Sequence, residues 1–258
     1  MDSEIKETKY CAIKALGFLP ELRETSIPKL KQILTDKTLD ERIKLELNAT
    51  LIRLGVDVWS FFKNYFHSNV PKDYLMESVL ILGELSELEQ AQELLLDIAS
   101  NTKFLSEIRA AAIWSMGKQT LLQSRVLDFV ADHDELVATH AIAIIEKKAD
   151  GRLTKELISK IGEDHRKNAA IARIISQLDS LNDREIIEAY LNADNPSIKQ
   201  WLLYSIGLSG KKRFEHLIDE LDKSSEKTKS RLQLLWEYHQ NWIVREIVDS
   251  IEFIKLQN

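Results

Sequence analysis

The stretch SEIRAAAIWSMGK, residues 106–118, contains a run of small and aliphatic residues that ends in an apolar residue followed by glycine. The pattern recurs along the chain, in some copies with the glycine and in others with the apolar spacing alone. Copies with glycine end at Gly17, Gly55, Gly83, Gly117 and Gly207, and weaker copies end at Glu146, Ile175 and Trp236. Successive ends lie 28 to 38 residues apart, which predicts a repeat architecture.

Within each copy, apolar residues stand at fixed distances before the terminal position. Position −4 holds Ile13, Leu51, Val79, Ile113, Ile142, Ile171, Leu203 and Leu232, and position −1 holds Leu16, Leu54, Leu82, Met116, Ile145, Ile174, Ile206 and Leu235. Steps of three and four residues place these side chains on one face of a helix, so each copy is predicted to bury an apolar stripe. Position −5 is small in most copies, which predicts that neighbouring helices approach closely.

Capping residues and intervening apolar segments complete the predicted helices. Ser106, Asp134 and the pair Asn195-Pro196 precede three of the copies as N-cap signals, and the terminal glycines suit left-handed C-terminal caps. Second helices are predicted over 27–34, 58–66, 88–99, 121–131, 153–161, 183–191 and 214–221. We therefore expect one all-α domain over residues 1–258, a right-handed α-solenoid of about seven to eight helical hairpins. Its C-terminal capping unit is expected at about 222–258, after the polar segment DKSSEKTKS.

Residues 106–118 resemble the short HEAT-like repeats of the phycobilin lyase type, and SIKQWLLYSIG, residues 197–207, is a looser copy. The resemblance implies a HEAT-repeat protein whose concave side is lined by the helices described above. Proteins with such repeats include bilin lyases, an iron hydroxylase of a modified lysine, alkylpurine DNA glycosylases of a related type, and many scaffolds. The resemblance therefore implies a fold and leaves the function open.

The composition favours a helical protein in a reducing compartment. Only 8 glycines and 4 prolines occur in 258 residues, which disfavours an all-β fold. No stretch approaches the roughly 20 apolar residues of a membrane span, and the charged N-terminus MDSEIKETKY lacks a secretion signal. The single cysteine, Cys11, lies in the apolar run CAIKAL and is expected to be a small core residue of a cytoplasmic protein.

Sequence signatures of catalysis are missing. The six histidines form no HExxH motif, no Cys/His cluster and no His-Glu dipeptide, so neither a zinc site nor a HEAT-type di-iron centre is supported. The chain also lacks GxSxG, P-loop and GxGxxG motifs, and the lone cysteine has no evident base. We therefore expect no catalytic residue, no metal and no cofactor, and a protein that functions by binding.

Positions −7 and −3 are predicted to stay free on the concave side. They carry aromatic and amide side chains and no carboxylate, and position −8 adds basic residues. The candidate partner-binding residues are Tyr10, Lys14, Arg109, Trp114, Lys167, Asn168, Lys199 and Tyr204. For the cations at position −8, the alternative is a structural ladder of ion pairs with acids of neighbouring repeats.

The charge distribution suggests a partner. The helices of the concave side carry 18 Lys and Arg against 14 Asp and Glu, whereas the rest of the chain carries 17 against 27. We expect a scaffold or adaptor that binds an acidic protein or peptide in its groove. The alternative is a nucleic-acid-binding protein, of glycosylase type if Trp114, Tyr204 and Arg109 hold a displaced base, although that row contains no aspartate. A bilin-lyase-like role rests on the resemblance alone.

The segment WSFFKNYF, residues 59–66, is the richest in aromatic residues. Trp59, Phe62 and Phe66 recur at helical spacing, which is typical of a thick part of the core. The alternative interpretation is an exposed aromatic anchor for a partner.

Overall fold

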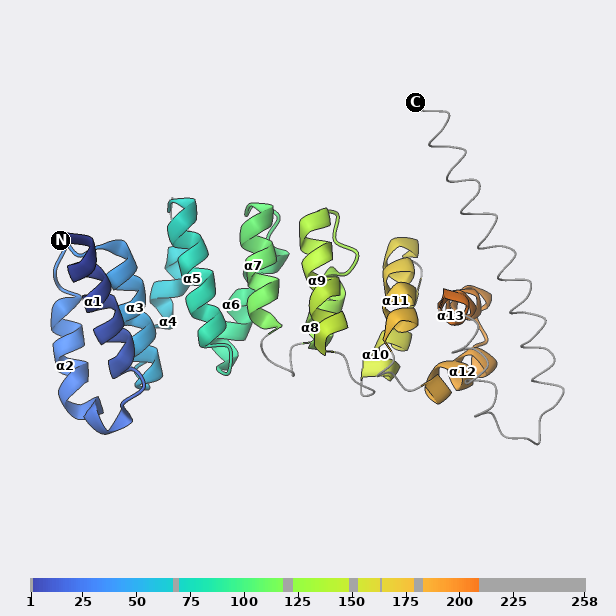
Figure 1. Cartoon of the computed structure of the whole chain (residues 1–258), viewed down its shortest axis with the longest axis horizontal. Helices are drawn as coiled ribbons and strands as arrows, with labels where there is room; N and C mark the ends of the chain where they lie inside the picture. The colour runs from blue at the N-terminus through green and yellow to red at the C-terminus, as the bar shows by residue number, and fades with distance from the viewer. Residues whose placement is uncertain are drawn as a thin grey trace, which may run out of the picture. The chain divides into compact units, whose positions relative to one another are not determined.

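The computed structural model describes residues 2–66, 70–117, 123–148, 153–162, 164–178 and 183–208, and all regular structure in these ranges is helical (Figure 1). The chain divides into two compact units, Met1–Val126 with Asp134–Ala141, and Leu127–His133 with Ile142–Asn258. The predicted helix over 214–221, the copy ending at Trp236 and the C-terminal cap lie outside the described residues. In the described part of the chain, no helix combines the length and apolar character that a membrane crossing requires.

In unit 1, the helices of the repeat copies alternate along the chain with the predicted second helices. Its elements are α1 (Asp2–Leu16), η1 (Pro20–Leu22), α2 (Arg23–Ile33), α3 (Glu41–Arg53), α4 (Trp59–Tyr65), α5 (Lys72–Glu84), α6 (Glu89–Ser100), α7 (Ser106–Met116), α8 (Gln123–Val126) and the first part of α9 (Glu135–Lys148). Helix α1 packs against α3, α3 against α5 and α5 against α7, and these four helices lie side by side in Figure 1. Helix α6 packs against both α5 and α7.

Unit 2 continues with η3 (Leu127–Phe129), the remainder of α9, α10 (Thr154–Ser159), α11 (His165–Gln177), α12 (Asp183–Asn192) and α13 (Pro196–Leu208). Helix α11 packs against α13, and α12 packs against both α10 and α13. The odd-numbered helices of both units correspond to the repeat copies, and the even-numbered ones to the predicted second helices.

The predicted apolar stripe is buried. Ile13, Leu51, Val79, Ile113 and Ile171 at position −4 and Leu54, Leu82, Met116, Ile145, Ile174 and Ile206 at position −1 are buried, whereas Ile142 and Leu16 are half-buried. The side chain of Leu203 and the residues of the last copy are not among those described. In unit 1, Tyr10, Ile13, Leu30, Ile43, Leu47, Leu51 and Leu54 form one core cluster across α1, α2 and α3.

Position −5 is buried at Thr50, Ser78, Ala112 and Ala141, as predicted, whereas Ala12 at the same position of α1 is exposed. Thr50, at that position in α3, donates its hydroxyl hydrogen bond to the backbone carbonyl of Ile13 in α1 at 3.1 Å. Ser115 in α7 similarly donates to the carbonyl of Val79 in α5 at 3.4 Å. Side chains of this size reach the backbone of the next helix, so larger ones would force the helices apart.

The prediction that Cys11 is a core residue is wrong, because its side chain is exposed. Helix α1 faces its core cluster through Tyr10 and Ile13. Cys11 follows Tyr10 by one residue and precedes Ile13 by two, which rotates it away from that face in a helix of 3.6 residues per turn. An apolar neighbourhood in the sequence therefore did not imply burial.

The capping predictions are partly correct. Asp134 accepts from the backbone N–H groups of Leu136 and Val137 at 3.0 and 3.3 Å, and Asn195 accepts from that of Ser197 at 2.8 Å. Ser106 is not an N-cap, since α7 already includes it and its hydroxyl bonds to the Asp134 carboxylate instead.

Left-handed glycine caps are the exception among the described residues. Gly55 alone has a positive φ there, of 80°. Gly83 lies inside α5, and Gly117 keeps a right-handed backbone with φ of −64°. Gly207 lies inside α13, so the expected left-handed cap is wrong at Gly17, Gly83, Gly117 and Gly207.

The aromatic segment belongs to the core. Trp59, Phe62 and Tyr65 of α4 are buried, and Phe62 is fully inaccessible. Phe66 meets Phe104 edge to face, with ring centroids 6.2 Å apart. The alternative of an exposed aromatic anchor is therefore wrong for the buried rings of α4.

Candidate functional site

Ion pairs cross the surface of α1, α3 and α5. Lys14 of α1 reaches Glu84 of α5, with 2.6 Å between Nζ and Oε1. Arg53 of α3 contacts Glu84 at 2.8 Å and the buried Glu46 at 2.5 Å. Because Lys14 and Arg53 both have carboxylate partners within the unit, this part of the surface offers little attraction to an acidic ligand.

Tyr10 belongs to the same charged area. Its hydroxyl donates to Glu77 of α5 at 3.2 Å, and the Arg42 guanidinium lies over its ring, 4.4 Å from the centroid. Arg42 also binds Glu77 at 3.1 Å. Burial, followed by the charge of Glu46, raises the pKa of the Tyr10 phenol, so the hydroxyl remains protonated and acts as a donor. The Tyr10 side chain is buried and ties α1 to α5.

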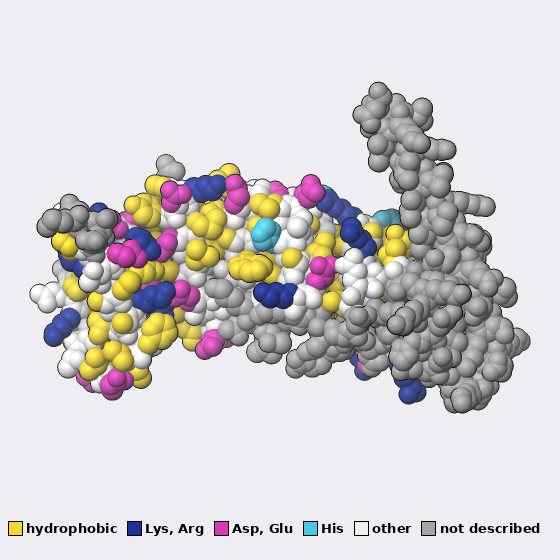
Figure 2. All heavy atoms as spheres, viewed as in Figure 1, with side chains coloured by type: hydrophobic (Ala, Val, Ile, Leu, Met, Phe, Trp, Pro, Cys, Tyr) yellow, Lys and Arg dark blue, Asp and Glu magenta, His cyan; other side chains and the backbone are white. Residues whose placement is uncertain are grey.

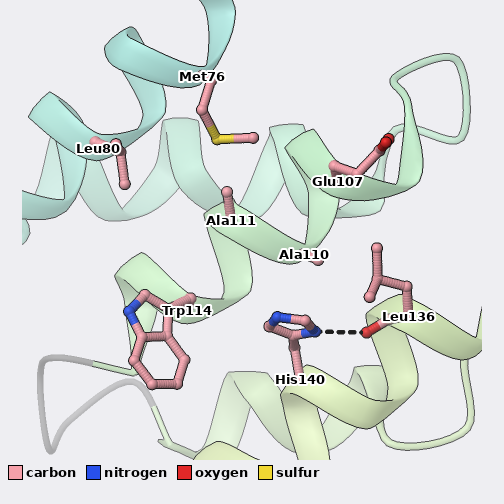
Figure 3. A pocket seen from close by; sticks show the side chains of 8 residues that line it. All are labelled: Met76, Leu80, Glu107, Ala110, Ala111, Trp114, Leu136 and His140. Carbon is pink, nitrogen blue, oxygen red and sulfur yellow. Dashed lines mark hydrogen bonds between the residues drawn. The ribbon is translucent and has the colours of Figure 1, made fainter.

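An apolar trough lies on the same unit over α5, α7 and α9. Figure 2 shows hydrophobic side chains gathered over these helices, whereas charged side chains are denser over α1 and α3. The depression has a volume of about 520 Å³ and is lined by Met76, Leu80, Glu107, Ala110, Ala111, Trp114, Leu136 and His140. Figure 3 shows Met76 and Leu80 on one side of α7 and Leu136 and His140 on the other.

The large apolar side chains around the trough are open to solvent. Leu80, Trp114 and Leu136 are exposed by 43%, 44% and 38%, and they come from three successive helices of this layer. Ala110 and Ala111 lie between them on α7 and are too small to fill the space. His140 is half-buried, and its Nδ1 lies 2.9 Å from the Leu136 carbonyl (Figure 3). Exposed apolar groups that converge in this way are typical of an interaction surface.

Carboxylates mark the end of the trough farthest from Trp114. Glu107 precedes Trp114 by seven residues, which is about 10.5 Å along α7. The Lys72 ammonium, 2.9 Å away, holds the pKa of the Glu107 carboxyl below its ordinary value. The hydrogen bond from Ser106 does the same for the pKa of Asp134, whose charge acts on Glu107. Both carboxyl groups are therefore ionised at neutral pH.

The structure distributes the eight predicted binding residues over different environments. Trp114 is exposed in the trough. Arg109 is buried, and its Nε donates to the Ala99 carbonyl at 2.7 Å. Asn168 is buried too, where it accepts from the N–H of Gly162 at 3.0 Å and donates to its carbonyl at 2.8 Å. Arg109 and Asn168 thus hold local structure beneath the surface.

The remaining predicted residues lie in unit 2. Lys167 and Lys160 both contact Asp128, at 3.3 and 3.0 Å, which agrees with the ladder interpretation for Lys167. Partial burial would raise the pKa of the Asp128 carboxyl, but the two ammonium groups outweigh it and lower that pKa.

Lys199 and Tyr204 lie among aromatic rings. The Lys199 ammonium lies 5.5 Å from the centroid of the Tyr190 ring. Tyr204 packs edge to face on Trp201, which meets His165 in turn. This aromatic group on α11 and α13 lies in unit 2, and the trough lies in unit 1.

The positions that are exposed in the structure differ in part from the predicted positions −7 and −3. Position −7 is buried at Tyr10, Asn48, Ala110 and Asn168, half-buried at Met76, and exposed at Thr139 and Gln200. Positions −7 and −3 of the predicted row line the trough at Met76, Ala110, Leu80 and Trp114, and positions −10 and −6 add Glu107, Ala111, Leu136 and His140. Sequence reasoning missed these four residues, although the spacing of four and three residues marks a second helical stripe that it could have revealed.

The described residues contain no cluster of three or more His, Cys, Asp or Glu side chains placed to hold a metal ion. The trough has one carboxylate and one imidazole in its lining, and both are bonded within the unit. The rest of its lining is apolar. No protein-family model matches the chain, and no curated protein matches it at a significant level.

Proposed function

We propose that this protein is a HEAT-like α-solenoid scaffold that binds a partner protein through the trough on α5, α7 and α9. The observation that carries the proposal is the exposure of Leu80, Trp114 and Leu136 around one depression. Tryptophan in an apolar surround is the residue type that most often dominates binding energy at interfaces. The repeated sequence pattern and the packing of α1, α3, α5 and α7 in chain order support the solenoid.

The pairing of the cations changes the expected chemistry of the partner. Lys14, Arg109 and Lys167 all bond within the protein, to Glu84, the Ala99 carbonyl and Asp128. This arrangement reduces the support for an acidic peptide and for a phosphate backbone, since both need available cations. We therefore favour a protein partner held by apolar anchors. The single cysteine is compatible with the proposed cytoplasmic setting.

A peptide library provides a direct test, because it requires no knowledge of the partner. Random peptides displayed on phage would be selected on the immobilised full chain, and the recovered peptides titrated against the parent and Trp114→Ala proteins. We expect the recovered peptides to share apolar anchors and to lose at least about tenfold in affinity for the variant. Substitution of Glu93 and Asp97, exposed on α6, is the control and should leave affinity unchanged.

Two results would count against the proposal. Peptides that bind parent and Trp114→Ala equally well would remove the trough as the binding surface. A loss of several decades in affinity between about 50 and 200 mM salt would indicate phosphate-like contacts and favour the nucleic-acid alternative. A shallow salt dependence is expected for apolar anchors.

A further inference from the structure

Helix α1 carries two stripes of apolar and small side chains, and its own unit covers one of them. Tyr10 and Ile13 face the core cluster. The second stripe has the spacing of three, four and three residues that is typical of a seam between paired helices. All of its members are exposed, and they are Ile5, Thr8, Ala12 and Ala15. A helix with such residues on two faces is expected to pack on both.

The equivalent stripe is covered on other helices of the same layer. The residues that correspond to Thr8, Ala12 and Ala15 are nearly or fully buried, and they are Glu46, Thr50 and Arg53 in α3 and Ile108, Ala112 and Ser115 in α7. Thr50 and Ser115 reach carbonyl oxygens of the preceding helices α1 and α5. The exposed stripe is therefore the face through which these helices stack, and α1 stands at the end of their row in Figure 1. The element that fits this face is another helix.

The small side chains leave room along α1. An open depression of about 810 Å³ lies on this side of the helix, and its described lining consists of Glu7, Thr8, Cys11 and Ala12. Thr8 and Ala12 belong to the stripe, so a second helix can approach the backbone of α1 closely.

The stripe is complementary to itself when two copies pair in opposite directions. A two-fold axis level with Tyr10 places Ile5 of one copy opposite Ala15 of the other. The same axis places Thr8 opposite Ala12. The largest side chain of the stripe thus meets a small one. A second copy always provides this match, whereas a helix of another sequence would need it by coincidence.

The charges beside the stripe permit this pairing. Lys6 and Glu7 already bind Asp40 and Arg42 of the same chain. Lys9 of the two copies would lie on one flank of the helix pair. The Lys9 side chains are exposed, so their repulsion is weak and is screened at physiological ionic strength.

We propose that two copies of this chain associate through α1, with the stripe of Ile5, Thr8, Ala12 and Ala15 packed antiparallel against its counterpart. This surface is separate from the trough, so the inference goes beyond the proposed function and does not depend on it. A contact of one helix from each copy is smaller than a standard protein interface, so the dimer is expected to form at micromolar concentrations.

Sedimentation velocity of the full chain, at concentrations up to about 200 µM, measures the association. The parent should shift reversibly from monomer to dimer. Ala12→Arg places a long charged side chain at the centre of the stripe and should lower the dimer affinity at least about tenfold. Its melting temperature should match that of the parent, because Ala12 is exposed. Ala143→Arg makes the same change at an exposed position of α9 and should leave the dimer intact.

The single cysteine of the chain reports the geometry of the pair. Cys11 is exposed and lies on the flank of the stripe opposite Lys9. In the antiparallel arrangement it lies beside the two-fold axis, so a short bismaleimide should join Cys11 of the two copies. Ala12→Arg should prevent this cross-link. The double change Cys11→Ser with Ala143→Cys moves the thiol to α9, and it should give little cross-linked dimer.

A parent that stays monomeric over this concentration range overturns the inference. A dimer that survives Ala12→Arg, or whose Cys11 thiols are not joined, overturns it as well. Trp114→Ala distinguishes this surface from the trough, because the variant should dimerise as the parent does even if it loses the selected peptides. A dimer that Trp114→Ala dissociates would use the trough in place of α1.

Discussion

Ala112→Leu tests the helix packing on which the trough depends. Ala112 is fully inaccessible in α7, at position −5 of its repeat. In α3 the equivalent residue, Thr50, lies 3.1 Å from a carbonyl oxygen of α1. Ser115, one turn after Ala112 in α7, reaches the Val79 carbonyl of α5. There is thus room for a methyl or hydroxyl group between these helices, and an isobutyl group would push α7 away from α5.

The expected cost is about 1–3 kcal/mol, the range measured when extra carbon atoms are forced into a packed core. For a chain of this length, each kcal/mol lowers the melting temperature by about 2–4 °C. Urea denaturation and scanning calorimetry of the full chain would give the two quantities independently.

Ala111→Leu is the matched control, because it makes the same change one residue earlier, where the side chain lines the open trough. Its stability should stay within about 0.5 kcal/mol of the parent. It should nevertheless weaken peptide binding by filling the trough. Equal urea midpoints for Ala112→Leu and the parent, or a greater loss for Ala111→Leu, would refute the assignment of the two faces of α7.

Three other substitutions probe the remaining assignments. Trp114→Ala should weaken a selected peptide by about 2 kcal/mol, roughly thirtyfold, with an unchanged melting temperature in calorimetry. Asn168→Ala should cost about 1–3 kcal/mol in urea denaturation, since it removes two hydrogen bonds from the buried Asn168 side chain to the backbone of Gly162, each worth about 0.5–1.5 kcal/mol; an unchanged midpoint would contradict that role. Asp128→Asn should destabilise the protein by less than about 1 kcal/mol at neutral pH, because the carboxylate is half exposed. Its folded pKa is lowered, so this stabilisation is complete above about pH 4 and is lost as the pH falls through the folded pKa. Melts of parent and variant that still differ well below that pH would argue against the ion pairs.

The helices and their buried stripes could be predicted because they depend on periodicity within one helix. Val79 and Leu82 stand three residues apart on α5, and helical geometry alone puts both on one face. The N-caps at Asp134 and Asn195 are similarly local, since a side chain there bonds to backbone groups two or three residues away.

The site required the tertiary structure because it depends on which helices are neighbours and how each is rotated. Tyr10 and Met76 both stand at position −7 of their repeats, yet Tyr10 is buried against Glu77 whereas Met76 lines the trough. Arg109 gave no sequence signal that its guanidinium would turn inward to the Ala99 carbonyl. Periodicity determines which residues share a face, whereas burial, pairing of charge and the apolar trough arise from contacts between residues far apart in the chain.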